Sequence, residues 1–252
     1  MAKQKGFTKI QGTLGETTFL ETRNGNQVRE KARSIAPQIK SSPAFARTRE
    51  NNIEFGRACK VAKLLKTSLA PLVGSAKGSN NSGRLVKKVM TIVKKDMVGL
   101  RGQRNVMDGP LTDLEQFEMN DKASMTAIAP IQFATAINRL TGVLSLTIPS
   151  FIPTNIVKVP EGTTHFRFVS MGVELEVEQE TSISQTKEGL PILWDKTATA
   201  PITVDHTVTP ASTNPLMLAL GIQFFQLVSG QLNPILLATK NSVVILKVNQ
   251  LH

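Results

Sequence analysis

Hydrophobic residues recur along this chain with two different periods, and the change between them falls near residue 123. Between residues 42 and 97, apolar residues lie three or four positions apart, as in a helix that buries one face. Beyond residue 123, polar and apolar residues alternate, as in strands that bury one face. The pattern therefore predicts an α+β protein whose main helices precede its main strands.

A short alternating segment precedes the helices, over residues 16–31. It contains Asn24-Gly25, a dipeptide typical of a type I′ hairpin turn because both residues accept a positive φ. We expect a β hairpin here, within an N-terminal arm that covers residues 1–41. A hairpin of this size is marginally stable alone, so we expect it to pair with another sheet edge, in this copy or a neighbour.

Helix signals follow the arm, in a segment that we assign to residues 42–110. Ser42 can cap a helix that has Pro43 at its first position, and Pro71 ends it. A short loop rich in Gly, Ser and Asn then leads to a second helix, which predicts an antiparallel helical hairpin. The apolar stripes expected to be buried are Phe45, Ile53, Ala58, Val61, Ala62, Leu65 and Leu69 on the first helix, and Leu85, Val86, Val89, Met90, Val93 and Met97 on the second.

The alternating segments within residues 111–252 number about seven and are separated by turn signals. They predict an antiparallel β-sandwich, immunoglobulin-like or jelly-roll-like. Strands and helices do not alternate along the chain, so a doubly wound nucleotide-binding fold is not expected.

Charge is distributed unevenly between these segments. Residues 1–110 hold 22 Lys or Arg and 7 Asp or Glu, whereas residues 111–252 hold 8 and 12, so +15 in the first part and −4 in the second make up the net +11. Such asymmetry is typical of a nucleic-acid or membrane surface in one part, or of two regions that attract each other between neighbouring copies.

Reactive side chains are few. His165 and His206 lie in alternating segments without metal-ligand spacing, and we interpret them as ordinary strand residues. Cys59 is the single cysteine, which excludes an internal disulfide and a zinc site built on several cysteines, and we interpret it as a small apolar filler. We therefore expect no catalytic residue, no cofactor, no metal and no enzymatic activity.

Two charged sets are candidates for contact with a partner. The acidic row, predicted to lie on one face of one strand, could be a solvated face, a docking surface for a basic partner, or a weak hard-cation site, although one flat strand does not enclose an ion. The basic set consists of Arg57, Lys60, Lys63, Lys87 and Lys94, and the acidic row of Glu174, Glu176, Glu178 and Glu180.

The favoured interpretation is a structural protein that binds itself. The basic helices of one copy would meet the acidic row of the next, and the hairpin would add strands to a neighbouring sheet, giving a filament, tube or shell. The first alternative is sequence-independent binding of nucleic acid through its phosphates. Base stacking could use only Phe45 and Phe55 in residues 41–110, and both are predicted core residues. An adhesin or another binding module is the second alternative.

The sequence has neither a recognisable secretion signal nor an uncharged apolar run of about 18 residues. We expect the protein to be made in the cytoplasm, without a transmembrane segment. Its final location does not follow from the sequence.

Five segments carry a resemblance to a known family. They are MAKQKG, GTLGETTFLETRNGNQVREK, SPAFARTRENNIEFGRACKVAKLLKTSL, RGQRNVMDG and LALGIQFFQLVSGQLNPI. They look like an uncharacterised family of small basic proteins found in Bacteroidetes, often in several copies, and the likeness is most specific in PAFARTRENNIEFGRA. This chain departs from the family in having Leu20 where an aromatic is usual and in lacking the usual glycine near Cys59. The resemblance implies no activity, cofactor or site residue.

Overall fold

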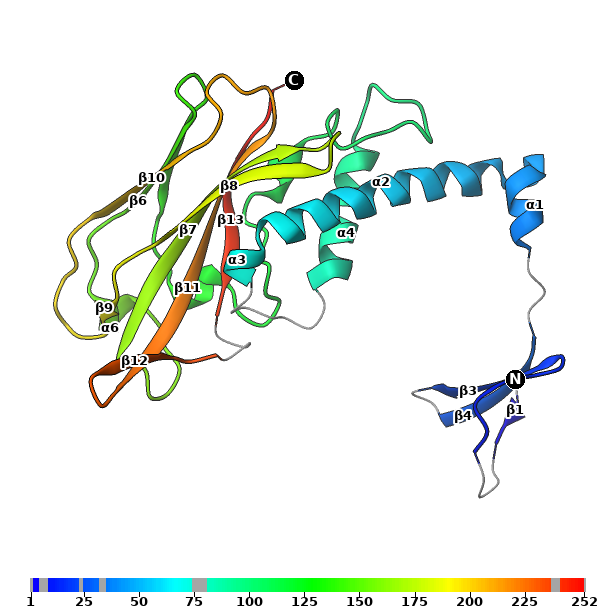
Figure 1. Cartoon of the computed structure of the whole chain (residues 1–252), viewed down its shortest axis with the longest axis horizontal. Coiled ribbons are helices and arrows are strands. Elements are labelled where there is room, and N and C mark those ends of the chain that lie inside the picture. Colours follow the sequence, from blue (N-terminus) through cyan, green and yellow to red (C-terminus); the bar gives the residue numbers. More distant parts are fainter. Residues whose placement is uncertain are drawn as a thin grey trace. The chain divides into compact units, whose positions relative to one another are not determined.

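The computed structural model describes residues 2–4, 9–22, 25–31, 35–73, 81–236 and 241–251. The chain forms two compact units, residues 1–49 and residues 50–252. Helices and antiparallel strands occur together, which confirms the predicted α+β class (Figure 1). The predicted boundary near residue 110 lies inside the second unit.

The first unit contains a four-stranded antiparallel sheet in the order β1-β4-β3-β2. Its strands are β1 (Ala2–Lys3), β2 (Gly12–Leu14), β3 (Thr17–Thr22) and β4 (Gly25–Glu30). The predicted hairpin forms from β3 and β4. Thr22 pairs with Gly25, so Gly25 begins β4 and the predicted turn is shifted by one residue. The remaining turn residue of that prediction, Asn24, lies outside the described residues.

Partners for the hairpin come from its own chain. β1 pairs with β4, and β2 pairs with β3, so both sides of the hairpin carry a short strand. The hairpin thus pairs within its own copy, one of the two arrangements expected, and β3 and β4 are inner strands, not free edges for adding strands to a neighbouring sheet. The predictive signal for β1 and β2 was weak because these two strands have only two and three residues.

Helical segments begin at the end of this unit and continue into the second. They are α1 (Ala36–Ser41), η1 (Pro43–Phe45), α2 (Ala46–Ser68), α3 (Ala70–Val73) and α4 (Asn81–Lys94). Ser42 makes no side-chain capping bond, and α2 begins three residues after the predicted first position, Pro43, because η1 occupies those residues. The two long predicted helices form, and their ribbons cross steeply in Figure 1.

The predicted apolar stripes are buried in their central parts. Ala58, Leu65 and Val89 are almost fully buried. Ile53 remains 49% exposed, and Met97 is 93% exposed because α4 ends at Lys94 and the chain turns away before reaching it.

The second unit contains two antiparallel sheets. The small sheet has the order β10-β6-β5, and the large sheet the order β12-β11-β7-β8, with β13 beside β11 and β9 beside β7. Their bounds are β5 Ala134–Asn138, β6 Val143–Ile148, β7 His165–Glu176, β8 Thr181–Glu188, β9 Ile192–Leu193, β10 Ile202–Thr207, β11 Leu216–Val228, β12 Gln231–Pro234 and β13 Val243–Asn249. Short helical turns accompany the strands: η2 (Leu111–Leu114) and α5 (Met125–Ile128) precede β5, and α6 (Pro153–Ile156) lies between β6 and β7.

The large sheet lies between two apolar layers, because alternate side chains of its strands point to opposite faces. Met171 and Ile245 pack with residues of α2 and α4. Phe168 and Leu220 pack against the small sheet through Leu146. Figure 1 shows helices on one side of this sheet and β6 with β10 on the other. The predicted sandwich thus carries the basic helices on its outer face.

Among the described residues, no helix combines the length and apolar character needed to cross a membrane. Nor do three or more His, Cys, Asp or Glu side chains come together as a metal site in that part of the chain.

Candidate assembly interface

The N-terminal sheet has one face with an apolar centre, which we call the Phe19 face. Paired residues of antiparallel strands place their side chains on the same side. Phe19 pairs with Val28, and Leu14 pairs with Thr17, which in turn pairs with Glu30. The alternation along β3 and the pairing place nine described residues on this face: Ala2, Gly12, Leu14, Thr17, Phe19, Glu21, Asn26, Val28 and Glu30.

The opposite face is mainly polar and basic. Thr13 pairs with Thr18, and Thr18 pairs with Arg29. Lys3 pairs with Gln27, and Gln27 pairs with Leu20, the only large apolar residue of this face among the described strands. The two faces therefore differ in the sign of their charge as well as in polarity.

No second layer covers the Phe19 face within its own unit. None of the described residues among residues 1–49 is buried, and Leu14 is 72% exposed. A small sheet gains stability by burying one face against another element. The Phe19 face thus has the composition of an inner face without the burial of one.

In the second unit, the loop after α4 is held by a buried carboxylate. Asp96 is 2% exposed and accepts hydrogen bonds from the backbone N–H groups of Val98 (2.7 Å), Gly99 (2.7 Å) and Asn105 (3.0 Å). Burial alone would raise the pKa of Asp96, but these bonds and nearby Arg104 outweigh it, so the pKa is lowered. The carboxylate is therefore charged at neutral pH and fixes the loop.

Two side chains of α2 fasten the same loop from the other side. Glu54, also 2% exposed, accepts a hydrogen bond of 2.7 Å from the N–H of Gly102. Arg57 donates through one guanidinium nitrogen to the carbonyl oxygens of Gly102 (3.2 Å) and Arg104 (2.9 Å). Arg57 is thus occupied within its own chain.

This firmly held loop exposes three large apolar side chains. Met97 is 93% exposed, Val98 81% and Leu100 74%. Such a group on an ordered loop is typical of a contact surface. The sequence did not indicate this exposed group because Met97 fits the period of α4 and was predicted to be buried.

An apolar groove of about 570 Å³ lies between α2 and α4. Its apolar lining is formed by Phe55 of α2, which is 52% exposed, and by Val86 and Met90 of α4. Lys87 and Lys94 line it as well. The interpretation of Phe55 as a core residue is therefore wrong, because its side chain points into this open groove.

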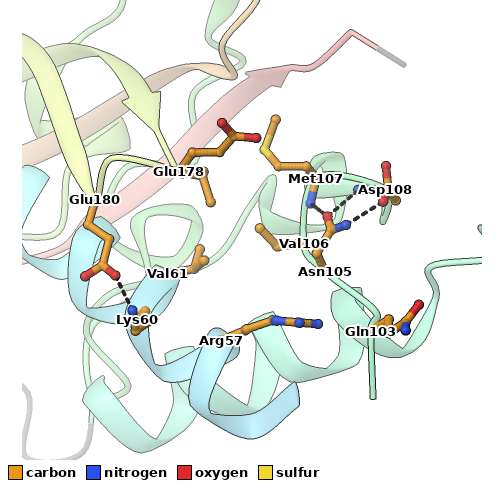
Figure 2. Close-up of a pocket in the computed structure, with 11 residues that line it drawn as sticks. Arg57, Lys60, Val61, Gln103, Asn105, Val106, Met107, Asp108, Glu178 and Glu180 are labelled. Carbon is orange, nitrogen blue, oxygen red and sulfur yellow. Dashed lines mark hydrogen bonds and ion pairs between the residues drawn. The ribbon is translucent and has the colours of Figure 1, made fainter. Parts of the chain in front are cut away.

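A second hollow, of about 560 Å³, brings predicted basic and acidic residues together (Figure 2). Arg57 and Lys60 lie on α2, whereas Glu178 and Glu180 lie in the turn after β7. Lys60 donates to the Glu180 carboxylate at 2.5 Å, and both side chains are about half exposed. One pair predicted to join neighbouring copies is thus formed within a single chain.

The acidic residues do not form the predicted row. β7 ends at Glu176, and Glu180 adopts φ +56° in the turn. Glu176 accepts a hydrogen bond of 2.6 Å from Thr181, and Glu178 is exposed. The alternating pattern continues beyond the strand because the turn residues happen to repeat it.

Glu174 departs furthest from the prediction, since it is 1% exposed. Its carboxylate accepts hydrogen bonds from the side chains of Ser212 and Asn214 and from the backbone N–H of Thr209. Burial alone would raise the pKa of Glu174, but these bonds outweigh it, so the pKa is lowered. Glu174 holds the 209–214 loop onto β7 and is not accessible to a partner.

Three of the five predicted basic residues are free to contact a partner. Lys63, Lys87 and Lys94 are exposed, and none of them forms an ion pair in the part of the chain that the structure describes. Only Lys87 and Lys94 line the groove. The structure thus divides the basic set into residues that bind their own chain and residues that face solvent.

The other predicted residues lie in ordinary positions. Cys59 is half buried on α2. His206 is fully buried between the sheets, with its Nε2 2.9 Å from the Ser170 hydroxyl, while His165 is partly exposed on β7. Gly172 makes room for His206, because a Cβ there would lie 2.6 Å from the His206 Cβ.

Comparisons with protein-family models, curated proteins and solved structures found no match for this chain. The resemblance to the Bacteroidetes family therefore stays a prediction.

Proposed function

We propose that this protein is a non-enzymatic structural protein that associates with copies of itself, head to tail, into a filament, tube or shell. The contact differs from the one predicted from the sequence. The N-terminal sheet docks through its Phe19 face, since β1 and β2 already flank the hairpin on both sides.

The uncovered Phe19 face carries this proposal. Leu14, Phe19 and Val28 lie on one side of a sheet whose unit has no buried residue in its described part. Phe19 and Val28 are half-buried, so docking would bury the rest of their surface. Full burial of a side chain of the size of Phe stabilises by about 1.5–3 kcal/mol, and completing it contributes part of that. Docking on another copy would supply the missing second layer.

The exposed loop adds independent support. Met97, Val98 and Leu100 stand in solvent on a loop that Asp96, Glu54 and Arg57 hold in place. A chain with two separate apolar surfaces of this kind suits a head-to-tail contact, in which each copy uses different surfaces toward its two neighbours.

Size-exclusion chromatography with light scattering on the full-length chain tests the proposal. The expected result is a mass of many copies for the unchanged protein, and at least about tenfold weaker association for Phe19→Ser, since tenfold corresponds to about 1.4 kcal/mol. Leu20→Ser is the matched control, because it makes the same kind of change on the opposite face. A monomer at all concentrations for the unchanged protein would overturn the proposal.

Nucleic-acid binding is the second candidate, supported by exposed Lys63, Lys87 and Lys94 within the +15 part of the chain. The same chromatography separates the two. With one Trp and no Tyr, the protein absorbs weakly in the ultraviolet, so bound nucleic acid would dominate the spectrum. Large particles that become monomers after nuclease treatment in high salt would favour this second candidate.

A further inference from the structure

We infer that the groove between α2 and α4 is the receptor for the Phe19 face of a second copy of this chain. The inference rests on the proposed self-association and assigns its partner surface. In this contact, the apolar residues of the Phe19 face pack on those of the groove, and its carboxylates lie against the lysines of the groove.

The groove supplies an apolar floor with a basic border. Phe55, Val86 and Met90 offer partly exposed apolar surface in a groove of about 570 Å³. Lys87 and Lys94 are two turns apart on α4, so they lie on the same side of that helix. A suitable occupant therefore needs an apolar centre and negative charge toward its margin.

The Phe19 face has that composition. Phe19 and Val28 form its centre, and Leu14 adds apolar surface on the edge strand β2. Glu21 and Glu30 lie toward opposite ends of the β3–β4 pair. Both glutamates are exposed. Phe55 and Phe19 are the aromatic residues of the two surfaces, and aromatic side chains often provide the largest energies in such contacts.

Charge also selects which face of the sheet docks. The opposite face carries Lys3 and Arg29, which would meet Lys87 and Lys94 with the same sign of charge. Like charges placed together across an interface cost several kcal/mol. The sheet thus fits the groove in one orientation, with its basic side outward.

The acidic side chains predicted from the sequence fit less well. Glu174 is buried, and Glu180 is paired with Lys60 of its own chain. Lys87 and Lys94, by contrast, have no ion-pair partner among the described residues. The N-terminal glutamates are therefore better partners for these two lysines than the predicted row.

Paired charge reversals test the contact in the full-length protein. One double variant carries Glu21→Lys and Glu30→Lys, and the other carries Lys87→Glu and Lys94→Glu. Each should associate at least about tenfold more weakly than the unchanged chain when alone, because like charges then face each other. Lys122→Glu with Lys158→Glu is the control for the lysine variant, since it makes the same change in net charge as Lys87→Glu with Lys94→Glu at exposed positions away from the groove.

Mixing the two double variants gives the decisive result. In the mixture the basic sheet of one variant meets the acidic groove of the other, and the unchanged sheet of the second meets the unchanged groove of the first. Light scattering should therefore show large particles that neither variant forms alone. A mixture that remains dissociated, or variants that behave like the control, would overturn the inference.

These outcomes remain distinct from failure of the proposed function. If the unchanged protein is a monomer, self-association itself is wrong. If it assembles but the reversals have no effect, assembly stands and the groove is not its receptor. The unchanged protein could also assemble while each double variant dissociates and does not recover on mixing. The Phe19 face would then dock on the groove of its own chain, and the inference of docking on a second copy would be wrong.

Discussion

The two units of this chain contrast in how their strands are stabilised. In the second unit, Phe166 and Leu220 are fully buried in a sheet that is covered on both faces. In the first unit, the strands are hydrogen bonded in good register, yet none of the described residues is buried. Backbone pairing alone contributes little net stability because water competes for the same hydrogen bonds. The contrast indicates that the second unit has its own core, whereas the first needs a surface to pack against.

Charged side chains also differ between the two units. Asp96, Glu54 and Glu174 are buried and accept several hydrogen bonds, so they fix loops of the second unit. In the first unit, the glutamates of the Phe19 face are exposed. Charged groups therefore hold loops within the second unit, whereas in the first unit Glu21 accepts one exposed hydrogen bond from Gln11 and Glu30 faces solvent.

The largest expected effect comes from opening the core of the second unit. Phe166→Ala should lower its free energy of unfolding by about 3–5 kcal/mol, since it leaves a cavity among well-packed side chains. Phe19→Ala in the first unit should change the unfolding of the second unit by less than about 0.5 kcal/mol. Urea titration at low protein concentration measures both. Equal effects would contradict the contrast between the two units.

The next effect tests the buried carboxylate of β7. Glu174→Ala should lower the free energy of unfolding by about 3 kcal/mol. The side chains of Ser212 and Asn214 and the backbone N–H of Thr209 would lose their hydrogen-bond acceptor. Arg139 would also lose a nearby opposite charge. Glu178→Ala is the matched control at an exposed position, with an expected change below about 0.5 kcal/mol. If Glu174→Ala weakened association without lowering stability, Glu174 would be an assembly contact after all.

A smaller expected effect is a loss of stability when the pH is lowered. Burial, together with the positive charge of Lys187, lowers the pKa of His206 to about 4 from an unfolded value of 6.5. The unfolded chain thus binds this proton more readily, and stability falls as the pH is lowered from about 6.5 toward 4. Between pH 7 and pH 5, the titration of His206 should lower the free energy of unfolding by about 2 kcal/mol.

The comparison for this prediction is His206→Gln, which removes the titrating group. Glu118, whose pKa is raised by burial, contributes in the opposite direction, but it does so in both proteins. The difference between the two unfolding curves therefore isolates His206. Parallel curves between pH 7 and pH 5 would show that His206 does not titrate as described.

The elements that formed from local patterns could be predicted from the sequence. The alternating segments within residues 111–252 indicated antiparallel strands there, and β11 is one of the strands that form in that region. The β3–β4 hairpin was also predicted, with its turn shifted by one residue. β1 and β2 were missed because two or three residues carry no measurable period.

Positions that depend on chain ends and long-range packing could not be predicted in this way. Glu174 and Glu180 share a period of two, but only the tertiary fold buries the first and places the second in a turn beside Lys60. Met97 fits the helical period, but α4 ends before it. Periodicity indicates which residues share a face, not where the element stops or what covers that face.

The most direct test of the central claim is amide hydrogen exchange in β3 and β4 of the full-length protein, measured over a series of protein concentrations. If the Phe19 face is covered by a second copy, the amides of these strands should become protected only where light scattering shows association, while those of β7 and β11 should be protected throughout. Protection of β3 and β4 that is the same in monomers and assemblies would contradict the account.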